Sequence, residues 1–338
     1  MRGPNARAPD GWFAFRSVCP ATWPATLATL IHLTPREHRN SATLVAIGDI
    51  HRCWREVDSV YLERTQPDLA MFVGDLGDED VEMVTRIANL SVNKAVILGN
   101  HDAWQSFAKK EVTDKLNDSL DVLGEDHIAY TVREVPSAGV SVVGARPFSW
   151  GGQSLRSPEV YDYIYGVHTM RQSAAAIVDA ARNAQHRDIV ILAHNGPTGL
   201  GKETNDIYGK DFGKPGGDWG DYDLELALQR IDGFGLNVRA VIAGHMHHRL
   251  LHPRGAERKR FIKRGDTMFI NTAVVPRVER DKDGNELSYF VRTNWQEGEC
   301  LSVEEVWVDT HGGEYSSTPV TCESIDDVGP AIDQVDEQ

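Results

Sequence analysis

The sequence predicts an α/β fold with neighbouring parallel strands, and three observations support this prediction. Apolar runs of strand length recur along the chain, and four of them end at a glycine followed by a polar residue. Apolar residues at helical spacing separate the first three runs. The chain has 338 residues, 41% of them hydrophobic, and can bury a sizeable core. Alternating strands and helices of this kind form βαβ units, whose strands lie parallel.

The first three strands are expected to end at Gly48, Gly74 and Gly99. A helical pattern from Trp54 to Tyr61 connects the first strand to the second. A second pattern from Val81 to Ala88, preceded by acidic residues, connects the second strand to the third. Because parallel strands end at the same edge of a sheet, the polar residues after these glycines are expected to meet there.

The remaining elements follow from the same patterns. We expect, in order, a helix at 104–123, a strand at 139–144, an aromatic loop at 145–168 with one helix, a helix at 169–183, a strand ending at His194, an irregular loop at 195–221, a helix at 222–231 and a strand ending at Gly244. Antiparallel strands are expected at 267–273, 275–280, 287–294 and 301–308. Residues 249–264 carry seven Lys or Arg and predict a solvated loop, in preference to a rim that attracts phosphate.

Composition divides the chain into three parts. Residues 1–40 contain five Arg and two acids, which suits either a disordered extension or an organelle transit peptide. Residues 41–308 form the predicted domain. From Asp309 to the end there are eight acids and no Lys or Arg, so residues 309–338 are expected to be a disordered acidic tail.

The overall composition restricts partners and compartment. A formal charge of −15 argues against a nucleic-acid footprint, since phosphate backbones are bound by clustered positive charge. No apolar run is long enough to predict a membrane span. Four cysteines lie far apart, which predicts a reducing compartment and no structural disulfide. We expect a cytoplasmic or plastid stromal protein that is not secreted; the oligomeric state is left open.

Polar residues at the predicted strand ends form a set of candidate metal ligands. The set comprises Asp49, His51, Asp75, Asn100, His194, His245 and His247, and His101 lies next to Asn100 without obviously being a ligand. Carboxylate, amide and imidazole donors suit Mn, Fe, Zn or Ni better than Ca or Mg. This number of ligands is too large for one tetrahedral ion and fits two metal ions that share a carboxylate. Because Asp75 follows the middle of the three adjacent strands, it is the expected bridging ligand. Two such ions can hold a bridging hydroxide for in-line attack on a phosphoryl group, which predicts a phosphorylated substrate.

Three residues beside these ligands have other predicted roles. His101 is expected to protonate the leaving oxygen, with Asp102 orienting its ring. Arg52 directly follows His51 and either contacts substrate phosphate or points to water. Asn100 is a candidate substrate contact as well as a ligand.

Five blocks of sequence resemble the signature of the calcineurin-like metallophosphoesterase superfamily, in the family's order. The blocks are Gly48-Asp49-Ile50-His51, Gly74-Asp75, Gly99-Asn100-His101-Asp102, His194 and Gly244-His245-Met246-His247. The resemblance covers about residues 41–308 and implies a four-layer αββα sandwich. The loops after Ala145 and His194 also resemble an uncharacterised branch found in cyanobacteria and plastid-bearing organisms.

The resemblance implies a role for each matching residue. Asp49, His51 and His247 would hold one metal ion, while Asn100, His194 and His245 would hold the other. Asp75 would hold both ions, and His101 would be the catalytic histidine. The blocks lack the forms typical of Ser/Thr protein phosphatases, which favours a small-molecule phosphomonoester or phosphodiester as substrate. A non-catalytic binding or scaffold protein on the same fold is the alternative.

Other motifs are weaker. Residues 196–203 nearly match a phosphate-binding P-loop, but Glu203 stands where a hydroxyl is required, so a nucleotide-binding regulator is disfavoured. Residues 281–286 are expected to form a hairpin turn and no calcium loop. Five histidines outside the blocks are not expected to be metal ligands: His127, His168, His186, His248 and His252. Five aromatic residues of the loops either line a pocket or pack the loops: Trp150, Tyr161, Tyr163, Tyr165 and Trp219.

Overall fold

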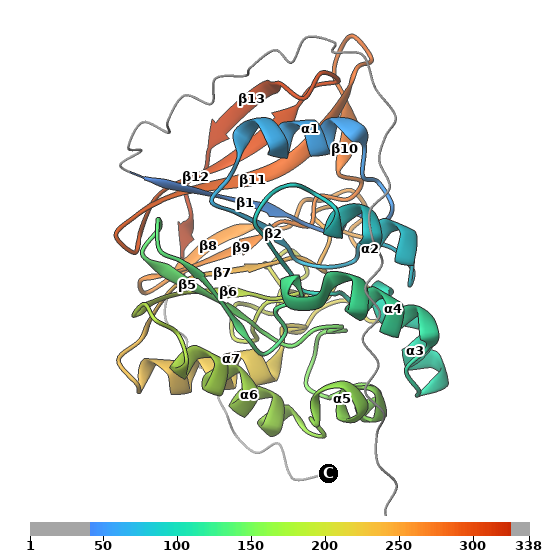
Figure 1. Ribbon diagram of the computed structural model, residues 1–338, viewed down its shortest axis with the longest axis vertical. Helices are drawn as coiled ribbons and strands as arrows, with labels where there is room; N and C mark the ends of the chain where they lie inside the picture. The colour runs from blue at the N-terminus through green and yellow to red at the C-terminus, as the bar shows by residue number, and fades with distance from the viewer. Residues whose placement is uncertain (1–40, 326–338) are drawn as a thin grey trace, which may run out of the picture. The chain divides into compact units, whose positions relative to one another are not determined.

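The computed structural model describes residues 41–325, which form two sheets packed face to face with helices on both outer sides (Figure 1). This is the expected four-layer αββα arrangement of an α/β fold. The predicted extension at 1–40 lies outside the described residues.

The first sheet contains the three parallel strands of the βαβ units. Its strands are β1 (Ala42–Ile47), β2 (Leu69–Phe72), β3 (Lys94–Val96), β10 (Val278–Arg280), β11 (Glu286–Gln296), β12 (Glu299–Val308) and β13 (Glu314–Pro319). The order is β13-β12-β11-β1-β2-β3, with β10 paired to β11. Strands β1, β2 and β3 are parallel neighbours, as predicted, and β11 joins β1 antiparallel.

The second sheet mixes parallel and antiparallel strands. Its strands are β4 (Val132–Val135), β5 (Val140–Gly144), β6 (Asp188–Leu192), β7 (Asn237–Ala243), β8 (Phe261–Arg264), β9 (Thr267–Asn271) and β14 (Glu323–Ser324). The order is β14-β8-β9-β7-β6-β5-β4. The parallel pairs β5–β6 and β6–β7 place the ends of β6 and β7 side by side.

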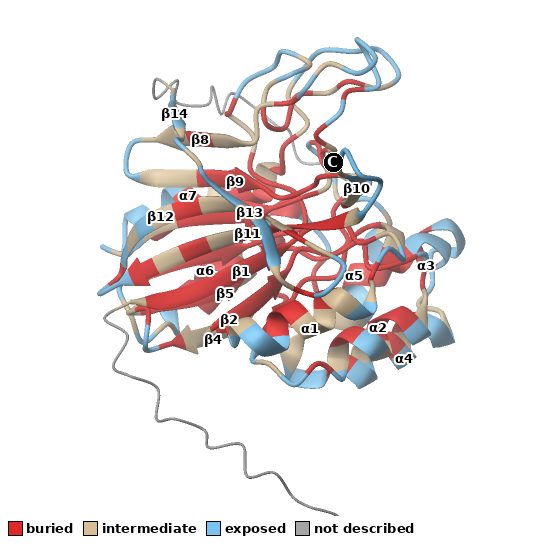
Figure 2. Ribbon diagram, turned by 90° about the horizontal axis from the view of Figure 1, so that it is seen from above, coloured by how far each residue is buried: buried red, intermediate tan, exposed pale blue. Residues whose placement is uncertain are grey.

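Seven α-helices occur in the described residues. They are α1 (Glu56–Thr65), α2 (Val81–Ala88), α3 (Trp104–Lys109), α4 (Asp114–Leu123), α5 (Pro158–Tyr165), α6 (Met170–Arg182) and α7 (Tyr222–Asp232). Their outward faces are exposed, whereas the central strands of both sheets are buried and edge strands such as β13 and β14 are exposed (Figure 2). No helix of residues 41–325 is both long and apolar enough to cross a bilayer.

Successive side chains of a strand point to opposite faces of its sheet, and this explains why each sheet is packed on both faces. In β1, Val45 and Ile47 belong to an apolar cluster that includes helical residues of α1, α2 and α4. Leu44 and Ala46 point the other way, into a cluster between the two sheets. Ile189 and Ile191 of β6 pack with α6 and α7. Each central strand is therefore covered on both faces, which is why its sequence is a continuous apolar run.

Several sequence predictions are corrected. The predicted helix at 104–123 is interrupted, because Lys110 adopts a left-handed conformation between α3 and α4. Residues 249–264 are only partly a solvated loop, since β8 pairs with β9 there. The tail is not disordered from 309 onward: β13 pairs with β12 and β14 with β8, so polar composition is compatible with edge strands. Residues 326–338 lie outside the described part.

Candidate metal centre

Five strands direct polar residues to one edge of the molecule. The loops after β1, β2 and β3 supply Asp49, His51, Asp75 and Asn100, and those after β6 and β7 supply His194, His245 and His247. The structure therefore brings together all seven predicted ligands from chain segments up to about two hundred residues apart.

The first group of donors contains Asp49, His51 and His247, whose ligand atoms lie within 4.8 Å of one another. The Nε2 atoms of His51 and His247 are 3.3 Å apart. Asp49 is 1% exposed, and its carboxylate accepts hydrogen bonds from the backbone N–H of His245. Those bonds fix the carboxylate between the loops of the two sheets.

The second group contains Asp75, His194 and His245, again within 4.8 Å, and His51, Asp75 and His101 lie equally close between the two groups. Asn100 joins the second group, since its Oδ1 lies 2.9 Å from Nε2 of His194. Asp75 connects the two groups, because its two oxygens face opposite ways. Oδ1 lies 3.4 Å from Nε2 of His194, and Oδ2 lies 3.7 Å from Nε2 of His51.

The hydrogen bonding of His194 shows that these donors fit a cation. Its Nδ1 lies 2.7 Å from the carbonyl oxygen of Val73, which can only accept, so Nδ1 carries the proton. In the neutral ring Nε2 then presents a lone pair toward two further acceptors, Asn100 Oδ1 and Asp75 Oδ1. Acceptors that converge on one point repel each other unless a positive ion lies between them. A histidine that donates its other N–H to a carbonyl is also the usual form of a metal ligand.

Burial keeps the imidazoles in the form that binds metals. It lowers the pKa of His194, His245 and His247, in the last case to about 4. Burial and then the charge of Asp75 raise the pKa of Asp49. Burial alone would raise the pKa of Asp75 too, but the nearby histidines, His194 foremost, lower it overall. Above their lowered pKa values the imidazoles are neutral, and with the carboxylates of Asp49 and Asp75 they form the donor set expected for transition metals.

The local backbone explains why glycine precedes the ligands. Asp49, His51, Asp75 and His245 have positive φ angles between 41° and 66°, a conformation that L-residues rarely adopt. A Cβ atom at Gly99 would collide with the carboxylate of Asp75. Such strain costs about 1–3 kcal/mol per residue and is typical of functional sites.

The predicted orientation of His101 by Asp102 is wrong. Nδ1 of His101 lies 2.7 Å from Oδ1 of Asp78, in the loop after β2. The carboxylate of Asp102 instead accepts three backbone N–H groups, those of Leu76, Gly77 and Gly99. Burial and then the charge of Asp75 raise the pKa of Asp102 to about 7. Asp102 therefore holds the ligand loops together.

Arg52 is not placed to contact a substrate. Its Nε donates to Oδ2 of Asp80 at 2.7 Å, and its side chain is 59% exposed. Asp80 is the N-terminal cap of α2 and accepts from the backbone N–H of Met83. The sequence left this contact unpredicted because the two residues lie 28 positions apart.

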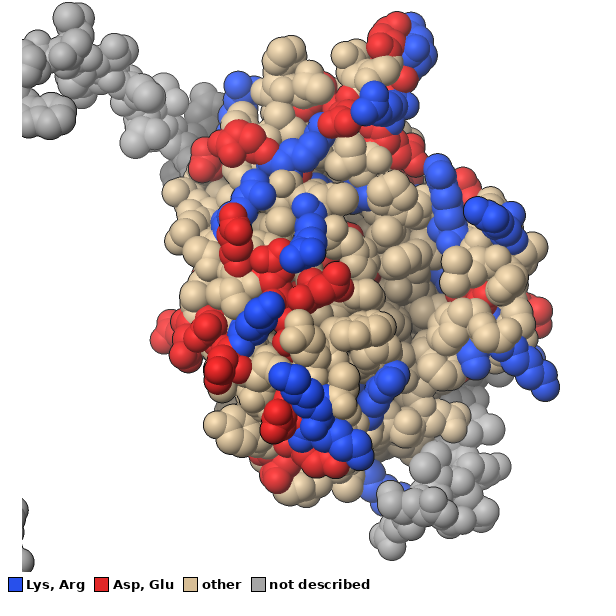
Figure 3. All heavy atoms as spheres, turned by 90° about the vertical axis from the view of Figure 1, so that its right-hand side faces the viewer, with Lys and Arg blue, Asp and Glu red and all other residues tan. Residues whose placement is uncertain are grey.

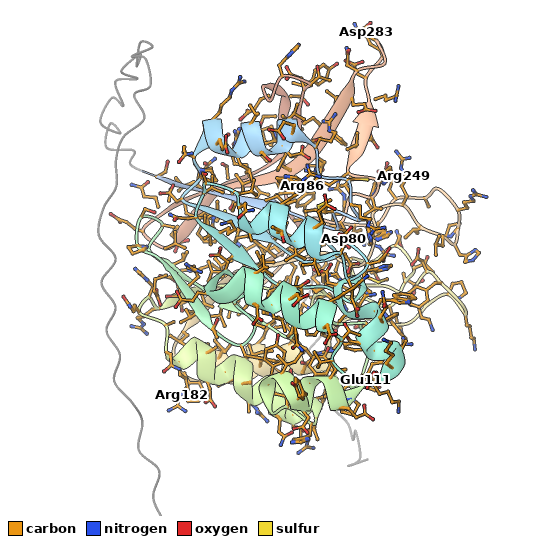
Figure 4. All side chains as sticks on the ribbon, turned by 45° about the vertical axis from the view of Figure 1, so that its right-hand side comes forward. Asp80, Arg86, Glu111, Arg182, Arg249 and Asp283 are labelled. Atoms are coloured by element: carbon orange, nitrogen blue, oxygen red, sulfur yellow. The ribbon has the colours of Figure 1, made fainter. Side chains whose placement is uncertain are left out.

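A cavity of about 570 Å³ opens beside the ligands. Asp75, Asn100 and His101 are among the residues that line it, so a substrate contact by Asn100 stays a prediction that fits its position. Trp150 and Trp219 line it as well, whereas Tyr161 is buried in the core and Tyr163 is exposed. Other lining residues that sequence reasoning missed are Trp104, Arg156, Asp211, Phe212 and Arg249. Figure 4 labels Arg249 at the side of the molecule from which the loops project.

Buried ion pairs fix the walls of this cavity. Arg146 is 2% exposed and contacts Asp221 at 2.9 Å and Asp223 at 2.8 Å, joining the aromatic loop to the N-terminal end of α7. Arg258 is also buried and donates to the carbonyl oxygens of His247 and Gly209. Both arginines lie in segments that the sequence predicted as loops.

The remaining motifs take the structural roles expected of them. No helix begins in the described chain between Glu203 and Tyr222, as a P-loop would require. Asp281 accepts backbone N–H groups in a turn between β10 and β11, which confirms the hairpin. Nδ1 of His248 accepts the backbone N–H of Val275. The three cysteines of the described residues are free.

A comparison of the sequence with protein families agrees with this geometry. The profile of the calcineurin-like phosphoesterases matches residues 42–249, more than half of the chain. The chain belongs to this family. Its members are metal-dependent phosphoesterases that typically bind two metal ions, although some are non-catalytic. The match spans all five blocks that carry the metal-ligand candidates.

Solved structures with a similar fold are remote. A hypothetical protein from Thermus thermophilus has a TM-score of 0.42 at 13% identity, over 79% of this chain and 99% of its own. A metallophosphoesterase from Sphaerobacter thermophilus has 0.30 at 11% identity, over 83% and 89%. A Vps29 mutant from Entamoeba histolytica has 0.34 at 13% identity, over 82% and 99%. No curated protein matches the sequence.

Proposed function

We propose that this phosphoesterase hydrolyses a phosphomonoester or phosphodiester of a small molecule with two metal ions. The observation that carries the proposal is the position of Asp75, whose two oxygens face the two histidine groups. One carboxylate between two sets of neutral imidazoles is the arrangement that two neighbouring ions need.

Different residues would hold the two metal ions. Asp49, His51 and His247 would hold one ion, Asn100, His194 and His245 the other, and Asp75 both. Bound there, Mn, Fe or Zn would supply positive charge for the phosphoryl oxygens and an activated water for in-line displacement.

His101 supports the leaving-group side of this proposal. Its ring lies 4.9 Å from the ring of His51 and lines the cavity. Its ring nitrogen also lies within 4.8 Å of donor atoms of His51 and Asp75, so the catalytic role given to it here rests on the family resemblance and on its position in the cavity. The carboxylate of Asp78 accepts from Nδ1 and so directs Nε2 away from itself. His101 can therefore hold a proton for the leaving oxygen, a contribution of about 10²–10⁴ in rate for a well-placed acid.

Hydrolysis of p-nitrophenyl phosphate and its bis ester with Mn²⁺ tests the proposal. We expect turnover of at least one ester, and a fall in kcat of about 10²–10⁴ in His101→Ala. His168→Ala is a matched control, since His168 also pairs with a carboxylate, that of Asp162 at 3.1 Å, but on the exposed surface. No turnover by protein shown to bind two ions would contradict the proposal and favour a binding or scaffold role.

A further inference from the structure

A strip of three neighbouring rings begins beside the metal-ligand candidates and lines part of the cavity. The ring centroids of His101 and Trp104 are 5.0 Å apart at 35°, and those of Trp104 and Trp150 are 5.0 Å apart at 41°. All three residues line the cavity. The strip begins at the histidine proposed to serve the leaving oxygen, so it extends in the direction in which a leaving group would lie.

Trp104 is unusually exposed for a tryptophan next to a polar site. It is 45% exposed at the start of α3, although its ring lies 5.0 Å from the tilted rings of both His101 and Trp150. An exposed aromatic surface beside a cavity is a common feature of ligand sites, because stacking a flat ring there removes both surfaces from water. Trp150 is less available, since the guanidinium of Arg156 lies 3.9 Å above its ring.

Two further aromatic residues of the lining belong to a loop that is cross-linked to the loop of Trp150. Phe212 and Trp219 line the cavity with ring centroids 5.2 Å apart. Nε1 of Trp219 donates to the carbonyl oxygen of Trp150 at 2.8 Å, and Gly152 donates back to the carbonyl oxygen of Trp219. The cross-linking of the two loops, together with the buried Arg146, means that the cavity exists before a ligand binds.

The volume of the cavity and the charge of its lining indicate what class of ligand it can hold. A cavity of about 570 Å³ has room for far more than a phosphoryl group and falls in the range of sites for drug-sized ligands. Arg156, Arg249 and Asp211 line it; Arg249 pairs with Glu279 at 2.8 Å, and Asp211 pairs with the buried Arg258 at 3.0 Å. On the face shown in Figure 3, Lys and Arg side chains, with Asp and Glu among them, lie around a central area of uncharged ones. The lining arginines are favourable for an anionic ligand even though the chain carries a formal charge of −15.

We propose that the substrate is a phosphoester whose leaving group carries a flat aromatic ring, which stacks on Trp104 while its phosphoryl group lies at the metal-ligand candidates. The inference rests on the proposed function and deepens it. A nucleobase and a simple aryl group share the required chemistry, and the test below separates them.

Two pairs of substrates isolate the ring from the reactivity of the ester. Adenosine 5′-monophosphate and ribose 5-phosphate both release a primary alkoxide, as do 2-phenylethyl phosphate and n-butyl phosphate. Base stacking on an aromatic side chain predicts a ratio of kcat/KM of about 5 to 150 in favour of the ring-bearing member. Preference in the first pair alone assigns a nucleobase, and preference in the second assigns a general aryl site.

Variants of Trp104 connect this preference to the strip. Trp104→Leu should bring the ratio close to one, and Trp104→Phe should keep most of it. Tyr315→Leu is the control, because Tyr315 is 51% exposed on β13 and does not line the cavity. A ratio near one for both pairs in the native protein, or an unchanged ratio in Trp104→Leu, would overturn the inference.

A binding measurement separates this inference from the proposed function. In metal-free protein, saturation-transfer NMR should show contact with the adenine protons of adenosine 5′-monophosphate, and Trp104→Leu should abolish it. Contact without hydrolysis by the metal-loaded protein would refute the phosphoesterase but keep the stacking site. Hydrolysis without NMR contact and without a preference for the ring-bearing substrate would support the phosphoesterase and refute the stacking site.

Discussion

Replacing Asp102 by Asn separates the two roles that a carboxylate beside His101 could have. In the structure Oδ2 of Asp102 accepts from Leu76 and Gly99, and Oδ1 accepts from Gly77. Asparagine keeps one acceptor oxygen and places an NH₂ group where the other was. At least one buried backbone N–H therefore loses its acceptor.

The expected loss of stability in Asp102→Asn follows from the number of backbone N–H groups that lose their acceptor. A buried donor left without an acceptor costs about 1–3 kcal/mol. In a domain of this size each kcal/mol lowers Tm by about 2–4 °C, so the fall should be about 2–12 °C. Thermal unfolding followed by circular dichroism in metal-free protein measures it, since bound metal would add its own stabilisation.

Asp78→Asn is the matched comparison. Asp78 is 61% exposed and pairs with His101, so its loss should leave Tm of the metal-free protein within about 1 °C. An exposed pair is worth about 0.2–1 kcal/mol, and kcat of the Mn²⁺-loaded enzyme should fall about 1.4- to 5-fold. An unchanged Tm in Asp102→Asn together with a fall in kcat as large as that of His101→Ala would refute the reasoning and restore Asp102 as the orienting group.

Three further predictions follow from burial and charge. Arg146→Ala leaves Asp221 and Asp223 buried without their partner, and should lower the free energy of unfolding by about 3–5 kcal/mol in urea denaturation, against less than about 1 kcal/mol for Arg52→Ala. Burial lowers the pKa of His127 to about 4, so between pH 6.5 and pH 4 the unfolded state binds a proton that the folded state does not. The free energy of unfolding should therefore fall by up to about 3 kcal/mol as the pH falls from 6.5 to 4. His127→Gln should lose that part of the pH dependence. Removal of metal by a chelator should lower Tm, and Mn²⁺ should restore it, because the ions bind the folded state; an identical Tm with and without Mn²⁺ would contradict a bound ion.

The sequence was sufficient for the metal-ligand candidates because they follow a local rule. The apolar strands β1, β2, β3, β6 and β7 each end at or near a metal-ligand candidate, and the rule needs no knowledge of distant contacts. The parallel order of β1, β2 and β3 follows from the helices between them, and it places Asp75 in the middle. The family profile agrees with the blocks, while the suggested cyanobacterial or plastid branch stays a prediction.

The parts that escaped prediction depend on contacts between distant segments. Asp78 has the pattern of an acidic helix start, and only the fold shows that it faces His101. Arg258 lies in a basic stretch that resembles a solvated loop, yet it is buried among carbonyl oxygens from the loop at 204–209. Trp104 has the pattern of an ordinary helical residue, because exposure beside a cavity leaves no local signal.

Metal stoichiometry tests the central claim most directly. Titration of metal-free protein with Mn²⁺, followed by dialysis and elemental analysis, should give two ions per chain. Asp75→Ala should lose both tight sites, Asp49→Ala should keep the ion held by His194 and His245, and Asp78→Asn should keep two. One ion per chain in the native protein, or two ions retained by Asp75→Ala, would contradict a centre shared through Asp75.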